Sequence, residues 1–178
     1  MQPKAILLNE EVVGRTLKRL SYEIVEKSDE LSEIVLIGIR TRGVPLAKII
    51  ADNIQQAFGM KIPLGELDIS LYRDDLSAVA DRPVVNSTKI DCDVTGKDVV
   101  LVDDVIFTGR TVRAAIDAVL AIGRPRRIRL AVLVDRGHRE LPIRADYVGK
   151  NVPTSLKELV AVHLTETDGR TDVELLEL

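Results

Sequence analysis

Hydrophobic residues near the N-terminus recur with the period of an α-helix. They follow one another at steps of four, three and four residues and are Val13, Leu17, Leu20 and Ile24. This spacing places them on one face, which we expect to be buried. Asn9 stands before this stretch, where its side-chain oxygen can cap the first free amide groups of a helix. The pattern therefore predicts a helix that begins beside Asn9.

The next apolar segments are continuous rather than periodic. Residues 34–39 (IVLIGI), 99–102 (VVLV) and 127–134 (RIRLAVLV) are typical of strands buried on both faces of a parallel sheet. Helical spacing returns in residues 43–58 and 111–122. Shorter strand patterns cover residues 62–72, 146–148, 160–164 and 173–176. The alternation predicts an α/β fold with helices on both faces of the sheet, whose ligands lie beyond the carboxyl ends of the strands.

Length and composition fit one compact domain that spans residues 1–178. Hydrophobic residues make up 46% of the chain and charged residues 30%, as in ordinary globular proteins. Cys92 is the only cysteine, so no internal disulfide can form and a reducing compartment is favoured. No apolar run suits a signal peptide or approaches the roughly 20 residues of a transmembrane helix. We therefore expect a cytoplasmic protein.

Charge is distributed unevenly along the chain. The net charge of −3 argues against a protein that coats nucleic acid indiscriminately. Residues 124–150 nevertheless contain eight Arg and Lys residues against three acids. A second basic group, formed by Arg15, Lys18 and Arg19, falls on the helix side opposite the apolar face. A solvated charged surface and an RNA-binding surface both remain open as explanations.

The segment VVLVDDVIFTGRT, residues 99–111, carries the first candidate site. Its apolar strand delivers Asp103 and Asp104 to the carboxyl edge of the sheet. Two adjacent ionised carboxylates repel each other and are poorly suited to a core. They suit a cation or a ligand with several hydroxyl groups, such as the diol of a ribose. An acidic turn without a ligand is the alternative that these two residues leave open.

A candidate phosphate site follows within the same segment. Thr108, Gly109, Arg110 and Thr111 stand where a loop meets the next helix. Glycine permits a tight turn, the threonines add hydroxyl donors, and the amide groups and dipole of a helix start attract an anion. A diol site beside a phosphate site matches the two ends of ribose 5-phosphate.

A second loop before a helix follows strand 34–39 and consists of Arg40, Thr41, Arg42 and Gly43. Gly38 and Gly43 have the spacing of the glycines of a P-loop, but the lysine and the hydroxyl residue that should follow Gly43 are absent. Guanidinium groups and backbone donors at a helix start still suit a pyrophosphate. This loop is therefore a second candidate anion site.

Two further segments follow strand ends. Residues 71–89 are polar and rich in breakers, and we expect a mobile lid there, although a surface loop without a role is the alternative. Val134, Asp135 and Arg136 close the last long strand, where a guanidinium and backbone groups can pair with the edge of a pyrimidine. These three residues are the candidate base site.

The order of these features resembles the phosphoribosyl pyrophosphate (PRPP) motif of type I phosphoribosyltransferases: four apolar residues, two acids, three mostly apolar residues, then Thr-Gly and a hydroxyl residue. The resemblance implies that fold, with a central mostly parallel sheet flanked by helices, a small hood and a flexible lid loop. It places the pyrophosphate of PRPP on the loop of residues 40–43. Asp103, Asp104 and Arg73 are then the candidate catalytic residues, with Arg40 and Arg42 beside the departing pyrophosphate.

The cofactor implied by the resemblance is Mg²⁺. It would bridge the pyrophosphate and the ribose hydroxyls of PRPP, so the substrate rather than the side chains would hold it. No cysteine, acid or second histidine stands at metal-ligand spacing from His138, so we expect no protein-bound zinc.

All four segments together resemble one branch of the family over nearly the whole chain. This resemblance implies uracil as the base, UMP as the product, a hairpin of pyrimidine operon mRNA as a second ligand, and control by uridine nucleotides such as UMP and UTP. We also expect a homodimer or a higher homo-oligomer. The positions that match RNA-binding positions of this branch are Arg19, Thr41, His138, Arg139, Arg144 and Lys150, and Lys18 stands where relatives carry Thr.

Phe107 agrees with a pyrimidine substrate. Hypoxanthine–guanine relatives carry an acid before Thr-Gly, placed to take a proton from the purine, and Phe107 stands there in this chain. A purine is therefore disfavoured. The alternative left open is a phosphoribosyltransferase for another base with no RNA-binding role.

Overall fold

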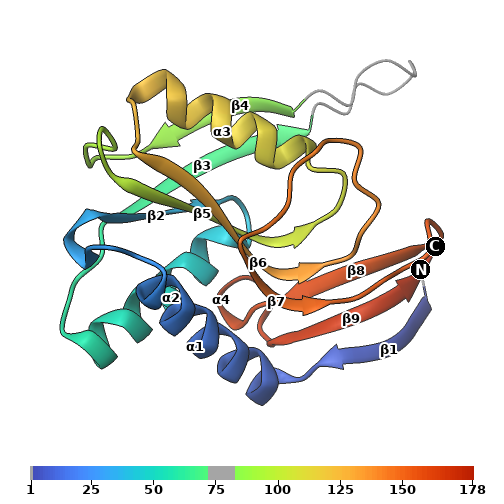
Figure 1. Cartoon of the computed structure of the whole chain (residues 1–178). Helices are drawn as coiled ribbons and strands as arrows, with labels where there is room; N and C mark the ends of the chain where they lie inside the picture. Colours follow the sequence, from blue (N-terminus) through green and yellow to red (C-terminus); the bar gives the residue numbers. More distant parts are fainter. Residues whose placement is uncertain (1, 72–82) are drawn as a thin grey trace.

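The computed structural model describes residues 2–71 and 83–178, and its centre is a six-stranded sheet in the order β4-β3-β2-β5-β6-β7 (Figure 1). The strands are β2 (Ile34–Ile39), β3 (Leu64–Leu71), β4 (Pro83–Lys89), β5 (Asp98–Ile106), β6 (Arg127–Asp135) and β7 (Tyr147–Asn151). All neighbours are parallel except β4, which runs antiparallel to β3. The expected mostly parallel sheet is confirmed.

Strand β4 corrects the prediction of a lid that continues to Lys89. Residues 83–89 pair with β3 between Glu66 and Leu71, so this part of the polar stretch is strand rather than loop. Two adjacent valines and a threonine give it β propensity that the surrounding polar residues obscure in the sequence. The remainder of the predicted lid, including Arg73, lies outside the described residues.

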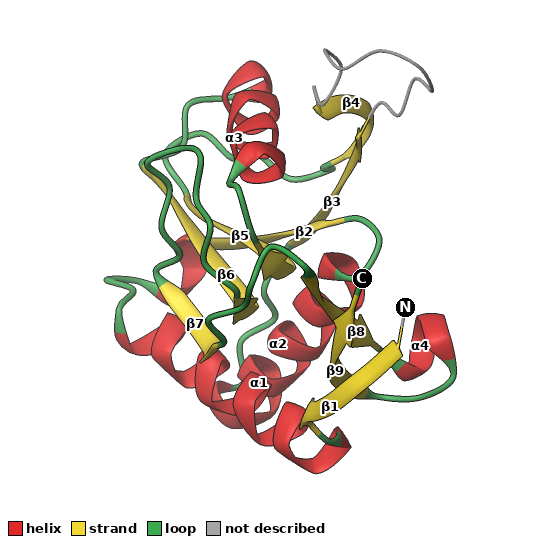
Figure 2. Ribbon diagram, turned by 90° about the vertical axis from the view of Figure 1, so that its right-hand side faces the viewer, coloured by secondary structure: helices red, strands yellow, loops and turns green. Residues whose placement is uncertain are grey.

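Helices cover both faces of the sheet, as predicted. Helices α1 (Glu10–Glu26) and α2 (Gly43–Phe58) lie on one face and α3 (Arg110–Ile122) on the other (Figure 2). The Asn9 side chain accepts a hydrogen bond from the Val12 amide at 3.0 Å, which confirms the predicted cap. A short 3₁₀ turn (Leu31–Glu33) leads from α1 into β2.

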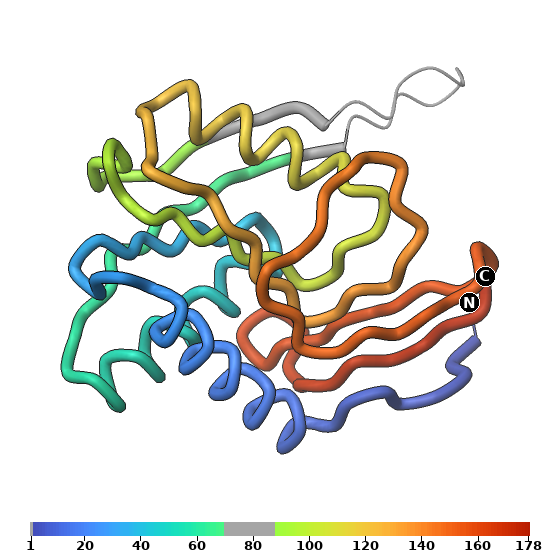
Figure 3. Tube along the Cα trace, in the orientation of Figure 1, coloured from blue at the N-terminus to red at the C-terminus, as the bar shows by residue number. Residues whose placement is uncertain are grey.

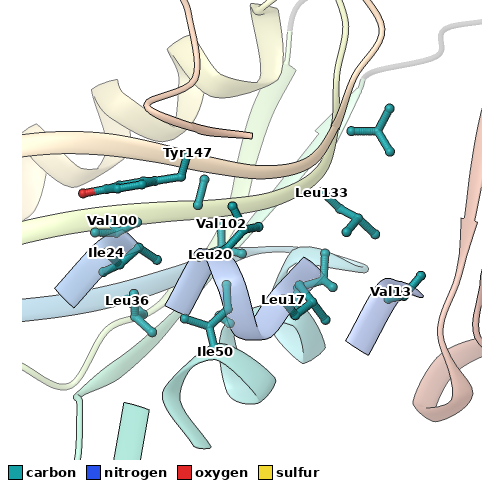
Figure 4. Close-up of a cluster of buried hydrophobic side chains, with 14 of the residues drawn as sticks. Val13, Leu17, Leu20, Ile24, Leu36, Ile50, Val100, Val102, Leu133 and Tyr147 are labelled. Carbon is teal, nitrogen blue, oxygen red and sulfur yellow. The ribbon is translucent and has the colours of Figure 1, made fainter. Parts of the chain in front are cut away.

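The continuous apolar runs are explained by burial on both sheet faces. Within β2, Leu36 packs into the core beneath α1 and α2, whereas its neighbour Ile37 packs into the core beneath α3. The predicted stripe of α1 enters the first core, where Leu17 and Leu20 approach Val102 and Leu133 of the central strands (Figure 4). These strands are therefore rigid supports for the loops that follow them.

A smaller antiparallel sheet stands beside the main one. Its order is β1-β9-β8, with β1 (Gln2–Leu8), β8 (Glu158–His163) and β9 (Asp172–Glu177), and α4 (Thr165–Asp168) joins β8 to β9. We call these four elements the hood. The first strand lies along the hairpin formed by the end of the chain (Figure 3), and its mostly exposed side chains leave no alternating pattern that would have predicted it. No helix in residues 2–71 or 83–178 is long and apolar enough to span a membrane.

Candidate active site

The two aspartates predicted at the end of a strand lie inside β5. This strand extends to Ile106, so the expectation that it ends at Val102 is wrong by four residues. Parallel pairing with β6 continues through Val105 and Ile106 and holds the extra residues in the ladder. Asp103 is only 8% exposed, and its carboxylate accepts a hydrogen bond from the Asp104 amide at 2.9 Å.

The environment of these carboxyl groups favours the uncharged form. Burial, followed by the neighbouring charge of Asp104, raises the pKa of Asp103 well above its ordinary value. Burial also raises the pKa of Asp104, although hydrogen bonding to Asp103 and the positive charge of Arg42 act in the opposite direction. A ligand that donates hydrogen bonds or brings a cation would relieve this cost.

The predicted phosphate site lies at the start of α3. Gly109 caps this helix with φ of 91°, a left-handed conformation that glycine adopts without steric cost. One cavity of about 330 Å³ joins Asp103 to residues 108–111, as a single ribose phosphate requires. The Arg110 side chain instead turns to Glu140, at 2.7 Å, so the candidate anion donors of this turn are its backbone amides and its threonine hydroxyls.

The loop of residues 40–43, which we call the pyrophosphate loop, is pressed onto the edge of the sheet. A Cβ atom on Gly43 would lie 2.2 Å from the Val102 carbonyl oxygen, so only glycine allows this approach. The peptide bond between Arg40 and Thr41 is cis. Arg40 and Thr41 line a second, more open cavity of about 850 Å³.

Both arginines of the pyrophosphate loop are paired with acids. The Arg40 guanidinium lies 3.2 Å from Glu66 and 3.8 Å from Asp68, two residues of β3. Arg42 donates two hydrogen bonds to Asp168 of the hood. No sequence pattern predicts the Arg42–Asp168 pair, because its members stand 126 positions apart.

The candidate base site is organised differently from the prediction. The Arg136 side chain is buried and donates to the Thr154 hydroxyl, at 3.1 Å, and to two backbone carbonyls of the loop that enters β8. Its guanidinium also lies over the Phe107 ring, 4.2 Å from the centroid. These contacts turn the guanidinium toward the hood, while Val134 and Asp135 are paired with β5 on one side and β7 on the other.

The loop after β6 is held by Arg139. Its guanidinium donates to Asp135 and to the carbonyl oxygens of Phe107, Gly137 and Ile143. Burial acts to raise the pKa of Asp135, but the hydrogen bond from Arg139 and its positive charge help to hold that pKa below its ordinary value. Arg139 therefore holds the loop after β6 against the end of that strand.

The candidate RNA-binding residues fall into separate groups. Arg19 of α1 donates to the carbonyls of Val148 and Gly149 in β7, at 3.1 and 2.7 Å, and Lys150 follows on the same strand. Lys18 is exposed beside Arg19. The others lie in the pyrophosphate loop, which holds Thr41, and in the loop after β6, which holds His138, Arg139 and an exposed Arg144.

One group of potential metal ligands occurs among the described residues, and it lies in the hood. His163, Asp172 and Glu174 bring their donor atoms within 4.8 Å of one another. The guanidinium of Arg170 already contacts both acids, at 3.3 and 3.0 Å, and supplies the cation that they need. This group is remote from the His138 segment considered in the sequence.

Comparison with known proteins agrees with this geometry. A model of the phosphoribosyl transferase domain matches residues 5–166, so the chain belongs to the phosphoribosyltransferase family. Its overall structure is similar to that of a hypoxanthine-guanine phosphoribosyltransferase from Bacillus anthracis, with a TM-score of 0.76, 21% identity and 98% of each chain covered. A hypoxanthine phosphoribosyltransferase from Trypanosoma cruzi also has a TM-score of 0.76, at 20% identity over 99% of this chain and 92% of the other. The expected type I fold is thereby confirmed.

Curated relatives narrow the family to one branch. The bifunctional protein PyrR of Clostridium novyi is 56% identical over 99% of both chains. PyrR of Chloroflexus aurantiacus is 59% identical over 96% of this chain and 93% of its own. Within the phosphoribosyltransferases, this chain is a member of the PyrR branch, which confirms the branch predicted from its four motifs.

Proposed function

We propose that this protein transfers the phosphoribosyl group of PRPP to uracil, giving UMP and pyrophosphate, and also binds a hairpin of pyrimidine operon mRNA under the control of UMP and UTP. The observation that carries the enzymatic part is the single cavity that joins the buried Asp103 to the helix start of α3. The PyrR relatives, which are called bifunctional, support the combination of two activities.

The first task of the site is to hold the ribose. Asp103 and Asp104 accept hydrogen bonds from the diol, while the amides of residues 109–111 and the hydroxyls of Thr108 and Thr111 bind the 5-phosphate. The bond from ribose C1 to pyrophosphate breaks as the bond to the uracil nitrogen forms, and positive charge develops on the ring. The nearby carboxylates stabilise this charge, so catalysis consists of positioning and electrostatics.

Departure of pyrophosphate is the second task. Arg40, Arg42 and the backbone of the pyrophosphate loop bind its oxygens, with Arg73 of the lid as a third cation. Oxygen ligands for a hard cation are present in Asp103 and Asp104, and the raised pKa of both groups fits a site completed by a cation. When bound with PRPP, Mg²⁺ supplies charge neutralisation of the leaving group.

The base is recognised without a side-chain acid or base at position 107. Phe107 contacts the Arg136 guanidinium and also the His138 ring, whose centroid is 5.8 Å from its own. Uracil is then placed at the end of β6, beside Val134, Asp135 and Arg136, where backbone that is not used in the strand ladder can pair with its O and N–H edge. Arg136 contributes by holding this backbone.

The RNA surface that we propose is the edge formed by α1 and β7. Lys18, Arg19 and Lys150 lie along this edge, where Arg19 is also paired with Glu23 and Lys150 donates to the Leu7 carbonyl, and Arg144 extends it. The scarcity of aromatic residues, 3% of the chain, favours phosphate and shape contacts over base stacking. Arg139 is bonded within the protein and serves this surface indirectly.

The substrate proposal is tested by incubating the protein with PRPP, Mg²⁺ and one base at a time, using uracil, orotate, hypoxanthine and guanine. We expect a nucleotide only with uracil. Efficient product from any other base would refute the proposed specificity, and absence of product from all four would refute the enzymatic activity.

A further inference from the structure

The carboxylate of Asp168 connects the hood to the pyrophosphate loop. Its Oδ1 accepts a hydrogen bond from Arg42 Nη2 at 2.9 Å, and its Oδ2 accepts one from Arg42 Nε at 3.3 Å. This two-point contact fixes the plane of the guanidinium, which a single contact cannot do. The side chains of Asp168 and Arg42 are only 19% and 33% exposed, so water competes weakly for the pair.

The carboxylate is itself anchored by the backbone around it. Asp168 Oδ2 also accepts a hydrogen bond from the Leu164 amide at 2.9 Å, and the Asp168 amide donates back to the Leu164 carbonyl. This local turn has its own orientation whether or not Arg42 is present. Asp168 is therefore a fixed partner on which the long, flexible Arg42 side chain settles.

Arg42 also acts electrostatically on the candidate ribose site. It is the residue directly before α2, in the pyrophosphate loop, and its positive charge is close enough to Asp104 to lower the pKa of that carboxyl group. Arg42 therefore contacts the hood through Asp168 and also influences the charge of Asp104. An arginine has five N–H donors, and the Asp168 contact uses two of them, which leaves donors for a ligand.

We propose that Asp168 is a positioning residue, which holds the Arg42 guanidinium in the orientation that binds the pyrophosphate group of PRPP. This inference rests on the proposed phosphoribosyl transfer and adds a role for the hood in it. An arginine loses substantial side-chain entropy when a ligand orders it. Because Asp168 has already ordered Arg42, that cost is removed from the binding of PRPP.

Asp168→Asn is the test, because asparagine can keep the Leu164 contact through its oxygen but loses the charged pair with Arg42. We expect the KM for PRPP and the Kd for Mg²⁺-pyrophosphate, measured by calorimetry, to rise about five- to tenfold. The KM for uracil and kcat should change less than about twofold, because Asp168 contacts neither the base site nor the diol carboxylates.

Asp172→Asn is the matched control. It is the same substitution in the same hood, in a side chain that is 15% exposed and also pairs with an arginine, Arg170. The control should leave the KM for PRPP and the Kd for Mg²⁺-pyrophosphate unchanged. Equal effects in the two variants would show a general loosening of the hood. An unchanged KM for PRPP in Asp168→Asn would mean that Asp168 has no role in binding PRPP, and a lower KM would mean that Asp168 competes with the ligand for Arg42. Each of these results overturns the positioning role.

The two proposals fail in different ways. If the unsubstituted protein neither binds PRPP nor forms UMP, the proposed function is wrong. If it does both and Asp168→Asn behaves identically, only the role of Asp168 is wrong. Circular dichroism and the midpoint of thermal unfolding of each variant show whether its fold is intact, and Mg²⁺-pyrophosphate binding can be measured even on a variant without turnover.

Discussion

At the scale of single residues, the carboxyl group of Asp103 has the most unusual environment in the site. Its pKa is well above the ordinary value because the group is buried and lies beside Asp104. A ribose diol donates hydrogen bonds, so it favours the ionised carboxylate. We therefore expect Asp103 to stay protonated to higher pH in the free protein than an ordinary carboxyl group does, and to lose its proton when the ligand binds.

We predict proton release when Mg²⁺-PRPP binds, and tighter binding as the pH rises through the pKa of Asp103. Calorimetric titrations at one pH in two buffers with different ionisation enthalpies measure this release, because the observed heats then differ. Asp103→Asn should reduce the difference. If the variant and the unsubstituted protein depend on the buffer to the same extent, Asp103 is not the source of the proton.

At the scale of secondary-structure elements, β5 and β6 are joined by charges at the ends remote from the active site. Asp98, 1% exposed, starts β5 and accepts hydrogen bonds from Arg126 and Arg127 at 2.9 to 3.0 Å. Burial acts to raise the pKa of Asp98, but the two arginines outweigh it and hold the pKa below its ordinary value. A buried carboxylate with two cationic partners stabilises the start of both strands.

Asp98→Asn should lower the free energy of unfolding by about 2 kcal/mol at neutral pH, since a charge-assisted hydrogen bond contributes about that much. The folded-state pKa is below the unfolded one, so the contribution is complete above the ordinary carboxyl pKa and is lost as the pH falls through the folded value. In urea titrations between pH 7 and 3, the free energy of unfolding should fall more steeply with decreasing pH in the unsubstituted protein than in Asp98→Asn. Asp117→Asn, whose partner Arg113 is 3.8 Å away with both side chains 68% exposed, is the control and should be neutral.

At the scale of the whole molecule, the two proposed functions occupy different places. The ribose and pyrophosphate sites lie at the carboxyl ends of β2 and β5 in the middle of the sheet, whereas the basic edge consists of α1 and the outermost strand β7. Substitutions at one place should therefore spare the other.

Asp104→Asn should reduce UMP formation about a hundredfold or more, because it removes a group that stabilises charge at the reacting centre, and should leave hairpin affinity within about twofold. Arg19→Ala with Lys150→Ala should weaken hairpin binding about tenfold and flatten its salt dependence, with UMP synthesis near normal. Filter binding at several salt concentrations and a UMP assay measure both activities.

The control for the RNA variant is Arg113→Ala with Arg124→Ala, which removes two exposed charges from α3 and the loop after it, on the opposite face of the sheet. Hairpin affinity should be unchanged there. Equal weakening in the two double variants would indicate that net charge, rather than the α1–β7 edge, governs binding.

The sequence determined the elements whose cause is local. The helix stripe that ends at Ile24 and the apolar runs of β2, β5 and β6 follow directly from burial on one or two faces, and the Thr108–Thr111 turn is a helix start with a glycine cap. The exposed β1 and the polar β4 were missed, because their pairing partners, rather than their own pattern, make them strands.

The directions in which the charged side chains turn depend on contacts between distant segments. The sequence predicts that Arg136 contacts a base, whereas in the structure its side chain is buried against the hood. Arg42 pairs with Asp168, which stands 126 positions further along the chain. A sequence shows that an arginine stands at a strand end, but its partners come from segments that only folding brings together. The residues that make up the candidate site can therefore be predicted from short sequence segments. The orientation of their side chains and their contact with the hood depend on long-range contacts.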